Sequence, residues 1–170
     1  MLTITNRTRY LLLTLMYLGM IGVGLFLQFV IELEPCPLCI LQRMAIMGTG
    51  LIALTALIQN PHSNKANRIY TVLLELGTFT SIGIALRHIW IQHLPADEAA
   101  SCGPGLEVTL DNIIAYFPQG SVTEALFRSS AECSEVSWRL FGLSLPELTL
   151  PFFVALAVYY AWLFFNQLKN

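Results

Sequence analysis

The sequence predicts an all-α membrane protein, a four-transmembrane-helix bundle with one long loop outside the membrane. Of its 170 residues, 55% are hydrophobic and only 12% are charged, whereas a typical soluble domain is about 25% charged. The mean hydropathy is +0.63, and the apolar residues gather in four long segments. This composition excludes a disordered chain and an ordinary soluble enzyme, and the net charge of −2 gives no basis for binding nucleic acid. We expect residues 1–170 to form a single membrane domain.

Each of the four segments has close to the roughly 20 apolar residues that a membrane-spanning helix needs. We expect spans at about residues 10–31, 38–58, 69–91 and 148–165. The first carries no charge, the second carries only Arg43, and the third carries Glu75 and Arg87. Short helices in a soluble core would be the alternative, but they rarely come as four such runs with so few charges.

The first apolar segment follows two arginines, as it would in a signal peptide. It is longer than the roughly 7–15 residues of a signal-peptide core, and no small-residue cleavage site follows it. We therefore expect it to be an uncleaved first span.

The positions of lysine and arginine predict the orientation, because these residues favour the cytoplasmic side. Those outside the spans precede span one, lie between spans two and three, or follow span four: Arg7, Arg9, Lys65, Arg68 and Lys169. Both termini are then cytoplasmic. The connector at residues 32–37 and the long loop at residues 92–147 then lie on the outer side.

The long outer loop contains an apolar pattern of its own. Leu106, Leu110, Ile113, Ile114 and Phe117 recur at helical spacing. We expect a short amphipathic helix there, either on the membrane surface or packed against the bundle.

Four cysteines lie on the predicted outer side: Cys36 and Cys39 at the mouth of span two, and Cys102 and Cys133 in the long loop. They allow two disulfides in three pairings, of which proximity favours Cys36–Cys39 and Cys102–Cys133. A structural bridge remains an equal alternative for the loop pair. A two-residue spacer is more typical of redox or metal sites. Structural zinc usually needs two such knuckles, which the loop pair does not supply, so we expect no metal.

The setting of the first pair favours reactivity. Pro37 is suited to open a helix, which places Cys39 in the first turn, where the helix dipole stabilises a thiolate. Arg43 follows four residues later on the same face, one turn deeper. Its cation would stabilise the thiolate further; the alternative is an arginine that reaches lipid headgroups.

A polar layer is expected at the depth of Arg43. Gln28 in span one and Arg87 and His88 in span three lie at a similar level. Polar groups inside a membrane are costly and often functional, so the layer suggests a pocket for a ligand with carbonyl oxygens. Hydrogen bonds between packed helices are the alternative for Gln28 and His88. Glu75 fits neither interpretation.

These residues carry a resemblance to a known family. Cys-Pro-Leu-Cys at 36–39 is followed by Ile-Leu-Gln-Arg at 40–43 at a span entrance, and one outer loop holds Cys102 and Cys133. Residues 133–146, with Trp138, are also similar. The chain resembles the disulfide bond formation protein B (DsbB) family over nearly its whole length.

The resemblance implies a disulfide-generating protein-dithiol:quinone oxidoreductase in the bacterial inner membrane, and we expect a monomer. Its partner would be a periplasmic thioredoxin-fold thiol oxidase similar to DsbA, whose thiolate attacks the Cys102–Cys133 disulfide. Electrons would then pass to Cys36–Cys39 and on to ubiquinone or menaquinone, which sustains disulfide bond formation.

The resemblance also assigns individual roles at the quinone. Cys39 would engage the quinone ring and Arg43 would lie near a quinone oxygen. Gln28 and His88 resemble family residues near the quinone, and Trp138 resembles the aromatic residue after the last loop cysteine.

Two other functions remain open. An enzyme similar to vitamin K epoxide reductase also places Cys-x-x-Cys at a quinone site. A non-enzymatic membrane scaffold with two structural disulfides would use the same four cysteines without redox turnover.

Overall fold

A computed structural model describes residues 5–94, 138–140 and 142–169. Its long helices are α1 (Asn6–Phe29), α2 (Pro37–Gln59), α3 (Asn64–Gln92) and α6 (Leu145–Lys169). Two short strands, β1 (Arg139–Leu140) and β2 (Leu143–Ser144), form a hairpin. All four helices are long and apolar enough to cross a membrane. The predicted four-helix membrane fold is therefore confirmed. The amphipathic loop helix expected around residues 106–117 lies outside the described residues.

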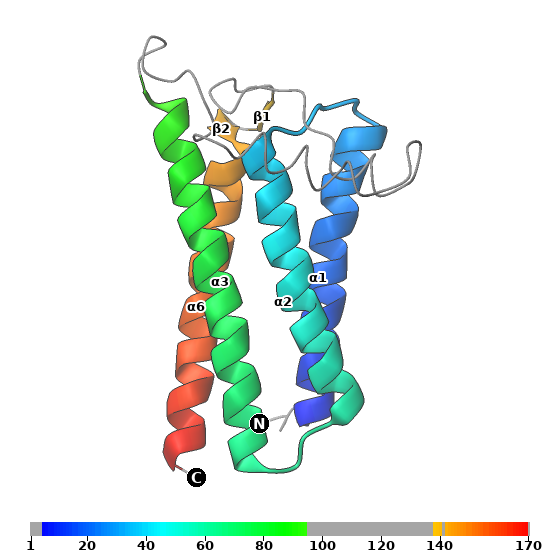
Figure 1. Ribbon diagram of the computed structural model, residues 1–170, viewed down its shortest axis with the longest axis vertical. Helices are drawn as coiled ribbons and strands as arrows, with labels where there is room; N and C mark the ends of the chain where they lie inside the picture. The colour runs from blue at the N-terminus through cyan, green and yellow to red at the C-terminus, as the bar shows by residue number, and fades with distance from the viewer. Residues whose placement is uncertain (1–4, 95–137, 141, 170) are drawn as a thin grey trace, which may run out of the picture.

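The helix ends follow local sequence signals. Thr5 caps α1, with its side chain accepting a hydrogen bond from the Thr8 backbone N–H. At the end of α2, Asn60 adopts a left-handed conformation with φ of 41°, which asparagine tolerates better than most residues. Ser63 precedes the first turn of α3. Only residues 60–63 separate α2 from α3, so the two helices run antiparallel as neighbours (Figure 1).

The hairpin leads directly into α6. Arg139 pairs with Ser144 and Leu140 with Leu143, and the turn uses Gly142 at φ of 84°, a conformation that favours glycine. The Glu147 carboxylate accepts hydrogen bonds from the backbone N–H and the hydroxyl of Ser144, at 2.7 and 2.8 Å. This capping interaction starts α6 where the hairpin ends.

The helices pack in the order α1, α2, α3, α6, and each lies beside the next (Figure 1). The bundle closes between α1 and α6, where the hydroxyls of Tyr17 and Tyr160 lie 3.0 Å apart and hydrogen-bond. Both rings are buried. Close approach of α2 and α3 depends on Gly77, because a Cβ there would lie only 2.2 Å from Thr49 Oγ1.

The outer surface of the bundle is apolar, as a lipid-facing surface must be. Large hydrophobic side chains with more than half of their surface exposed occur on all four helices, including Leu18, Ile58, Leu76 and Val158. In water such a surface would be an aggregation hazard, whereas in a bilayer it is the expected boundary.

The two ends of the bundle differ. Figure 1 places both chain termini and the α2–α3 connection at one end, and the α1–α2 connector and the hairpin at the other. The start of α2, which carries the Cys-Pro-Leu-Cys sequence, therefore lies beside the hairpin. This end holds the candidate site.

Candidate active site

The dithiol is built around the start of α2. Cys36 is the residue that caps the helix, in an extended conformation, and Pro37 occupies the first turn. The Cys36 sulfur accepts a hydrogen bond from the Cys39 backbone N–H at 3.3 Å. The Cys-Pro-x-Cys sequence therefore brings the two sulfur atoms together at a helix N-terminus, where the dipole favours a thiolate.

Both cysteines of this pair are free thiols, and they differ in their surroundings. Cys36 Sγ donates to Cys39 Sγ at 2.9 Å. Cys36 is 4% exposed, whereas Cys39 is half-buried. The hydrogen bond to Cys39, followed by burial, raises the pKa of the Cys36 thiol above its usual range. When the dithiol loses one proton, Cys36 therefore keeps its own and donates to Cys39, which is the sulfur better placed to act as a thiolate.

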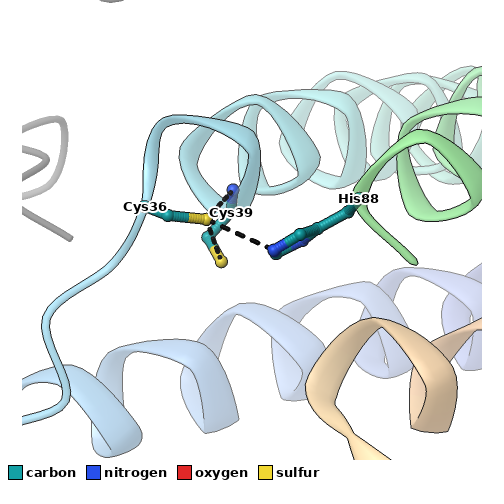
Figure 2. Close-up of side chains that lie close together, drawn as sticks. All are labelled: Cys36, Cys39 and His88. Carbon is teal, nitrogen blue, oxygen red and sulfur yellow. Dashed lines mark hydrogen bonds between the residues drawn. The ribbon is translucent and has the colours of Figure 1, made fainter. Parts of the chain in front are cut away.

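His88 approaches the dithiol from α3. Figure 2 shows its ring pointing at the start of α2, with Nε2 3.6 Å from Cys36 Sγ. The Gln92 side-chain nitrogen lies 3.3 Å from the same His88 nitrogen, one helical turn along. One ligand atom from each of Cys36, Cys39 and His88 lies within 4.8 Å of the other two. These three side chains could together hold a metal ion.

Arg43 joins α2 to α1 one turn below the dithiol. Its guanidinium donates to the Gln28 side-chain oxygen and, at 3.0 Å, to the backbone oxygen of Gly24. The guanidinium lies close against the backbone at Gly24, where a Cβ would be in van der Waals contact with Arg43 Nε at 3.4 Å. Arg43 is half-buried between two helices, so it does not reach toward lipid headgroups.

A cavity of about 460 Å³ opens beside these residues. Its polar lining includes Cys36, Cys39, Arg43 and His88. Its apolar lining comes mainly from α1, α2 and α6 and includes Met16, Met20, Leu27, Ile46 and Phe152. The volume is typical of sites for small organic ligands, which are mostly apolar with a few polar groups that set orientation.

Two glutamines in the cavity wall were not among the predicted site residues. Gln42 Nε2 and Gln92 Oε1 are buried, and neither atom has a hydrogen-bond partner among the described residues. Buried polar atoms are normally paired, so an unpaired donor and an unpaired acceptor favour a polar ligand. The one sequence feature that points to Gln42 is its position between Cys39 and Arg43.

The remaining predicted residues have different placements. Gln28 binds Arg43 but does not line the cavity, whereas Trp138 does line it. Arg87, expected in the polar layer, is exposed and stacks on Trp90 at 4.8 Å; that expectation was wrong, because residue 87 faces outward while its neighbour faces the bundle. Cys102 and Cys133 lie outside the described residues.

Comparisons with known proteins identify the family. The family model described as "Disulfide bond formation protein DsbB" matches residues 6–163. The protein named disulfide bond formation protein B of Nitrosococcus oceani is 44% identical over 143 residues, covering 84% of this chain and 82% of the relative. Its namesake from Acinetobacter baumannii is 41% identical over 143 residues, covering 84% and 81%. The Chromobacterium violaceum protein of that name is 38% identical over 162 residues, or 95% of each chain. A match over nearly the whole length, with the Cys-Pro-Leu-Cys dithiol inside it, shows that the chain belongs to the disulfide bond formation protein B (DsbB) family.

Proposed function

We propose that this multi-pass protein of the bacterial inner membrane reoxidises a periplasmic DsbA-like thiol oxidase and passes the electrons to a membrane quinone. Electrons enter at the Cys102–Cys133 disulfide, move by thiol–disulfide exchange to Cys36–Cys39, and leave to the quinone. The observation that carries this proposal is the dithiol in the wall of an apolar cavity that also contains unpaired polar groups.

The cavity fits the chemistry of a quinone. A quinone head has two carbonyl acceptors on a flat apolar ring, and its isoprenoid tail is apolar. Gln42 Nε2 is a buried donor in need of an acceptor. The Arg43 guanidinium has five N–H donors, of which α1 uses two, so it can also donate into the cavity. The apolar wall formed by Met16, Met20 and Phe152 suits the ring and the start of the tail.

The reaction balances without a further cofactor. Two thiols of Cys36 and Cys39 lose two electrons and two protons and form one disulfide, and the quinone gains them and becomes a hydroquinone. Cys39 is the sulfur that engages the quinone, because it is the more exposed of the two and Cys36 donates a hydrogen bond to it. Either ubiquinone or menaquinone meets these requirements.

The disulfide that the partner attacks is assigned to the loop pair, which lies outside the described residues. The dithiol at residues 36 and 39 is unsuited to direct attack by a protein, since Cys36 is 4% exposed. A second pair in the long loop would relay the electrons, as the family resemblance implies. A monomer suffices for this relay, because all four cysteines belong to one chain.

The dithiol end of the bundle is assigned to the periplasm. The opposite end carries Lys65 and Arg68 in the first two turns of α3, together with both termini (Figure 1), and cations beside the ends of spans favour the cytoplasm. In intact spheroplasts treated with a reductant to open the disulfides, a thiol reagent that cannot cross the membrane should label Cys102. Labelling that occurs only after lysis would reverse the orientation.

The activity itself is tested with purified full-length protein. Reduced DsbA-like protein and a water-soluble ubiquinone or menaquinone analogue are added, and quinone reduction is followed by absorbance. We expect turnover in the wild type and none in Cys39→Ser. Cys102→Ser should lose turnover with the protein partner but keep a single reduction of quinone when Cys36–Cys39 is reduced by a small dithiol.

Two outcomes of these assays would contradict the proposed function. Quinone reduction that is unaffected by any cysteine substitution would refute the electron route. A protein that binds no quinone and transfers no electrons would be a scaffold with two structural disulfides.

A further inference from the structure

We propose that the reduced dithiol and His88 form a binding site for a thiophilic divalent cation such as Zn²⁺, and that the bound cation blocks electron transfer. The three ligands would be Cys36 Sγ, Cys39 Sγ and His88 Nε2. The inference goes beyond the quinone function and does not depend on it, since it rests on the geometry of these three atoms.

The distance between one sulfur and the imidazole nitrogen already matches a zinc site, and all three ligand atoms lie within 4.8 Å of one another. Zinc binds sulfur at about 2.3 Å and imidazole nitrogen at about 2.0–2.1 Å in a tetrahedral arrangement, which puts the sulfur and nitrogen atoms roughly 3.5–3.6 Å apart. Cys36 Sγ and His88 Nε2 are 3.6 Å apart. The same arrangement puts two sulfur atoms about 3.8 Å apart, and here they are 2.9 Å apart. Zinc binding therefore requires the Cys39 side chain to rotate so that its sulfur moves away from that of Cys36.

The state of His88 also suits ligation. Gln92 Nε2 lies 3.3 Å from His88 Nε2, and an amide nitrogen can only donate. The His88 nitrogen in this contact is therefore an acceptor, which is the form that binds a metal. A cation at this nitrogen displaces the Gln92 amide and takes over its place in the cavity wall.

Charge and ligand type select the cation. Two thiolates, one neutral imidazole and one divalent ion give a complex with no net charge, which suits a buried site near the membrane. Sulfur and imidazole ligands favour zinc over magnesium or calcium, which prefer oxygen. The fourth coordination position faces the cavity and can hold a water molecule, as in zinc sites with three protein ligands.

Binding and redox turnover exclude each other. When the cation binds, the two thiols release two protons to solvent and both sulfurs bind the metal, with no change in oxidation state. The oxidised pair has no thiolate to offer, so the cation binds only the reduced protein. Sulfurs held by the cation cannot form a disulfide until a chelator removes it.

The test uses the full-length protein with Cys102→Ser and Cys133→Ser, which leaves Cys36 and Cys39 as its only cysteines. The reduced protein is titrated with Zn²⁺ against a chromophoric chelator, and with Co²⁺ to detect thiolate-to-cobalt charge-transfer absorption. We expect one cation per chain in the reduced form, release of two protons, and no binding to the oxidised form.

The role of His88 is tested against the histidine at the C-terminal end of the same helix. His88→Ala should weaken Zn²⁺ binding by at least tenfold, because loss of even an indirect metal partner costs about 10–100-fold. His93→Ala is the control and should bind as the parent does, since His93 is exposed and its Nδ1 contacts the Ile89 carbonyl oxygen at 2.8 Å. His88→Gln provides a polar replacement should the alanine variant fail to fold.

Three results would overturn the proposal. They are equal Zn²⁺ affinity in the parent and both His88 variants, the same Co²⁺ spectrum in the oxidised and reduced forms, and no binding by the reduced parent. Quinone reduction by the same samples is measured separately, so failure of the zinc site and failure of the quinone function remain distinguishable.

Discussion

Replacing Arg43 by alanine removes the guanidinium that, within residues 5–94, 138–140 and 142–169, lies in the cavity wall beside the dithiol. If Arg43 donates to a quinone oxygen, the variant should use quinone poorly while keeping its fold. The four helices do not depend on this side chain, because α1 and α2 remain in contact along their length. The defect should therefore appear in quinone kinetics and not in helix content.

The size of the effect follows from the bonds that are lost. A hydrogen bond to a charged group contributes about 1.5–3 kcal/mol, or roughly tenfold to a hundredfold in the quinone KM or in kcat/KM. The variant also loses the hydrogen bonds from Arg43 to Gln28 and Gly24, which hold the neighbouring part of α1 against α2. Arg43→Lys should recover only part of the activity. The planar guanidinium can donate to Gln28, Gly24 and a quinone at once, whereas the compact ammonium of lysine cannot.

The assay compares KM and kcat for a water-soluble quinone analogue in wild type, Arg43→Ala and Arg43→Lys. Arg87→Ala is the matched control: Arg87 is also an arginine in a span, but it is exposed and stacks on Trp90. Circular dichroism and thermal unfolding in detergent verify the fold. A quinone KM within twofold of wild type in a folded Arg43→Ala protein would refute the assigned role.

Three further predictions concern other parts of the chain. Gly77→Ala should lower the unfolding free energy by about 1–3 kcal/mol, since its Cβ would meet Thr49 Oγ1 at 2.2 Å; combining it with Thr49→Ala should restore most of the loss in thermal unfolding. In the reduced protein, carboxymethylation of Cys36 by iodoacetate, mapped by mass spectrometry, should stay low at pH 8 and rise only at clearly higher pH, because its raised pKa keeps the thiol protonated. A DsbA-like partner without its resolving cysteine should form a mixed disulfide with Cys133→Ser protein, through Cys102, and little with Cys102→Ser.

A different result would contradict each of these three predictions. Equal unfolding of wild type and Gly77→Ala would mean that α2 and α3 do not approach as closely as described. Rapid modification of Cys36 at pH 8 would place the proton of the pair on the other sulfur. A conjugate formed only with Cys102→Ser protein would exchange the roles of the two loop cysteines.

The sequence predicts the large features well because each depends on local composition. Four apolar runs are sufficient to predict the four helices. Proline after Cys36 predicts the start of α2, and the spacing of Cys39 and Arg43 places both on one face. The exact helix ends are less predictable: α3 begins at Asn64, well before the apolar run near residue 69, because polar residues extend a helix beyond the membrane core.

Features that depend on the rotation of one helix against another could not be predicted. Adjacent residues Arg87 and His88 face opposite environments, and composition does not say which of them faces the bundle. The unpaired amides of Gln42 and Gln92 become informative only when burial is known. The contact between Gly77 and Thr49 likewise requires the register between α2 and α3.

Cys36 has two tasks at once, because its sulfur both takes part in the dithiol and caps α2 by accepting from the Cys39 backbone N–H. Thermodynamic linkage then couples the redox state to the stability of the first turn of the helix. If the cap is stronger in one redox state by about 1 kcal/mol, which lies within the range for helix caps, the reduction potential moves by roughly 20 mV, since 30 mV corresponds to about 1.4 kcal/mol for two electrons. Conversely, a substitution that loosens this turn more in one redox state than in the other retunes the potential of the dithiol without touching either sulfur.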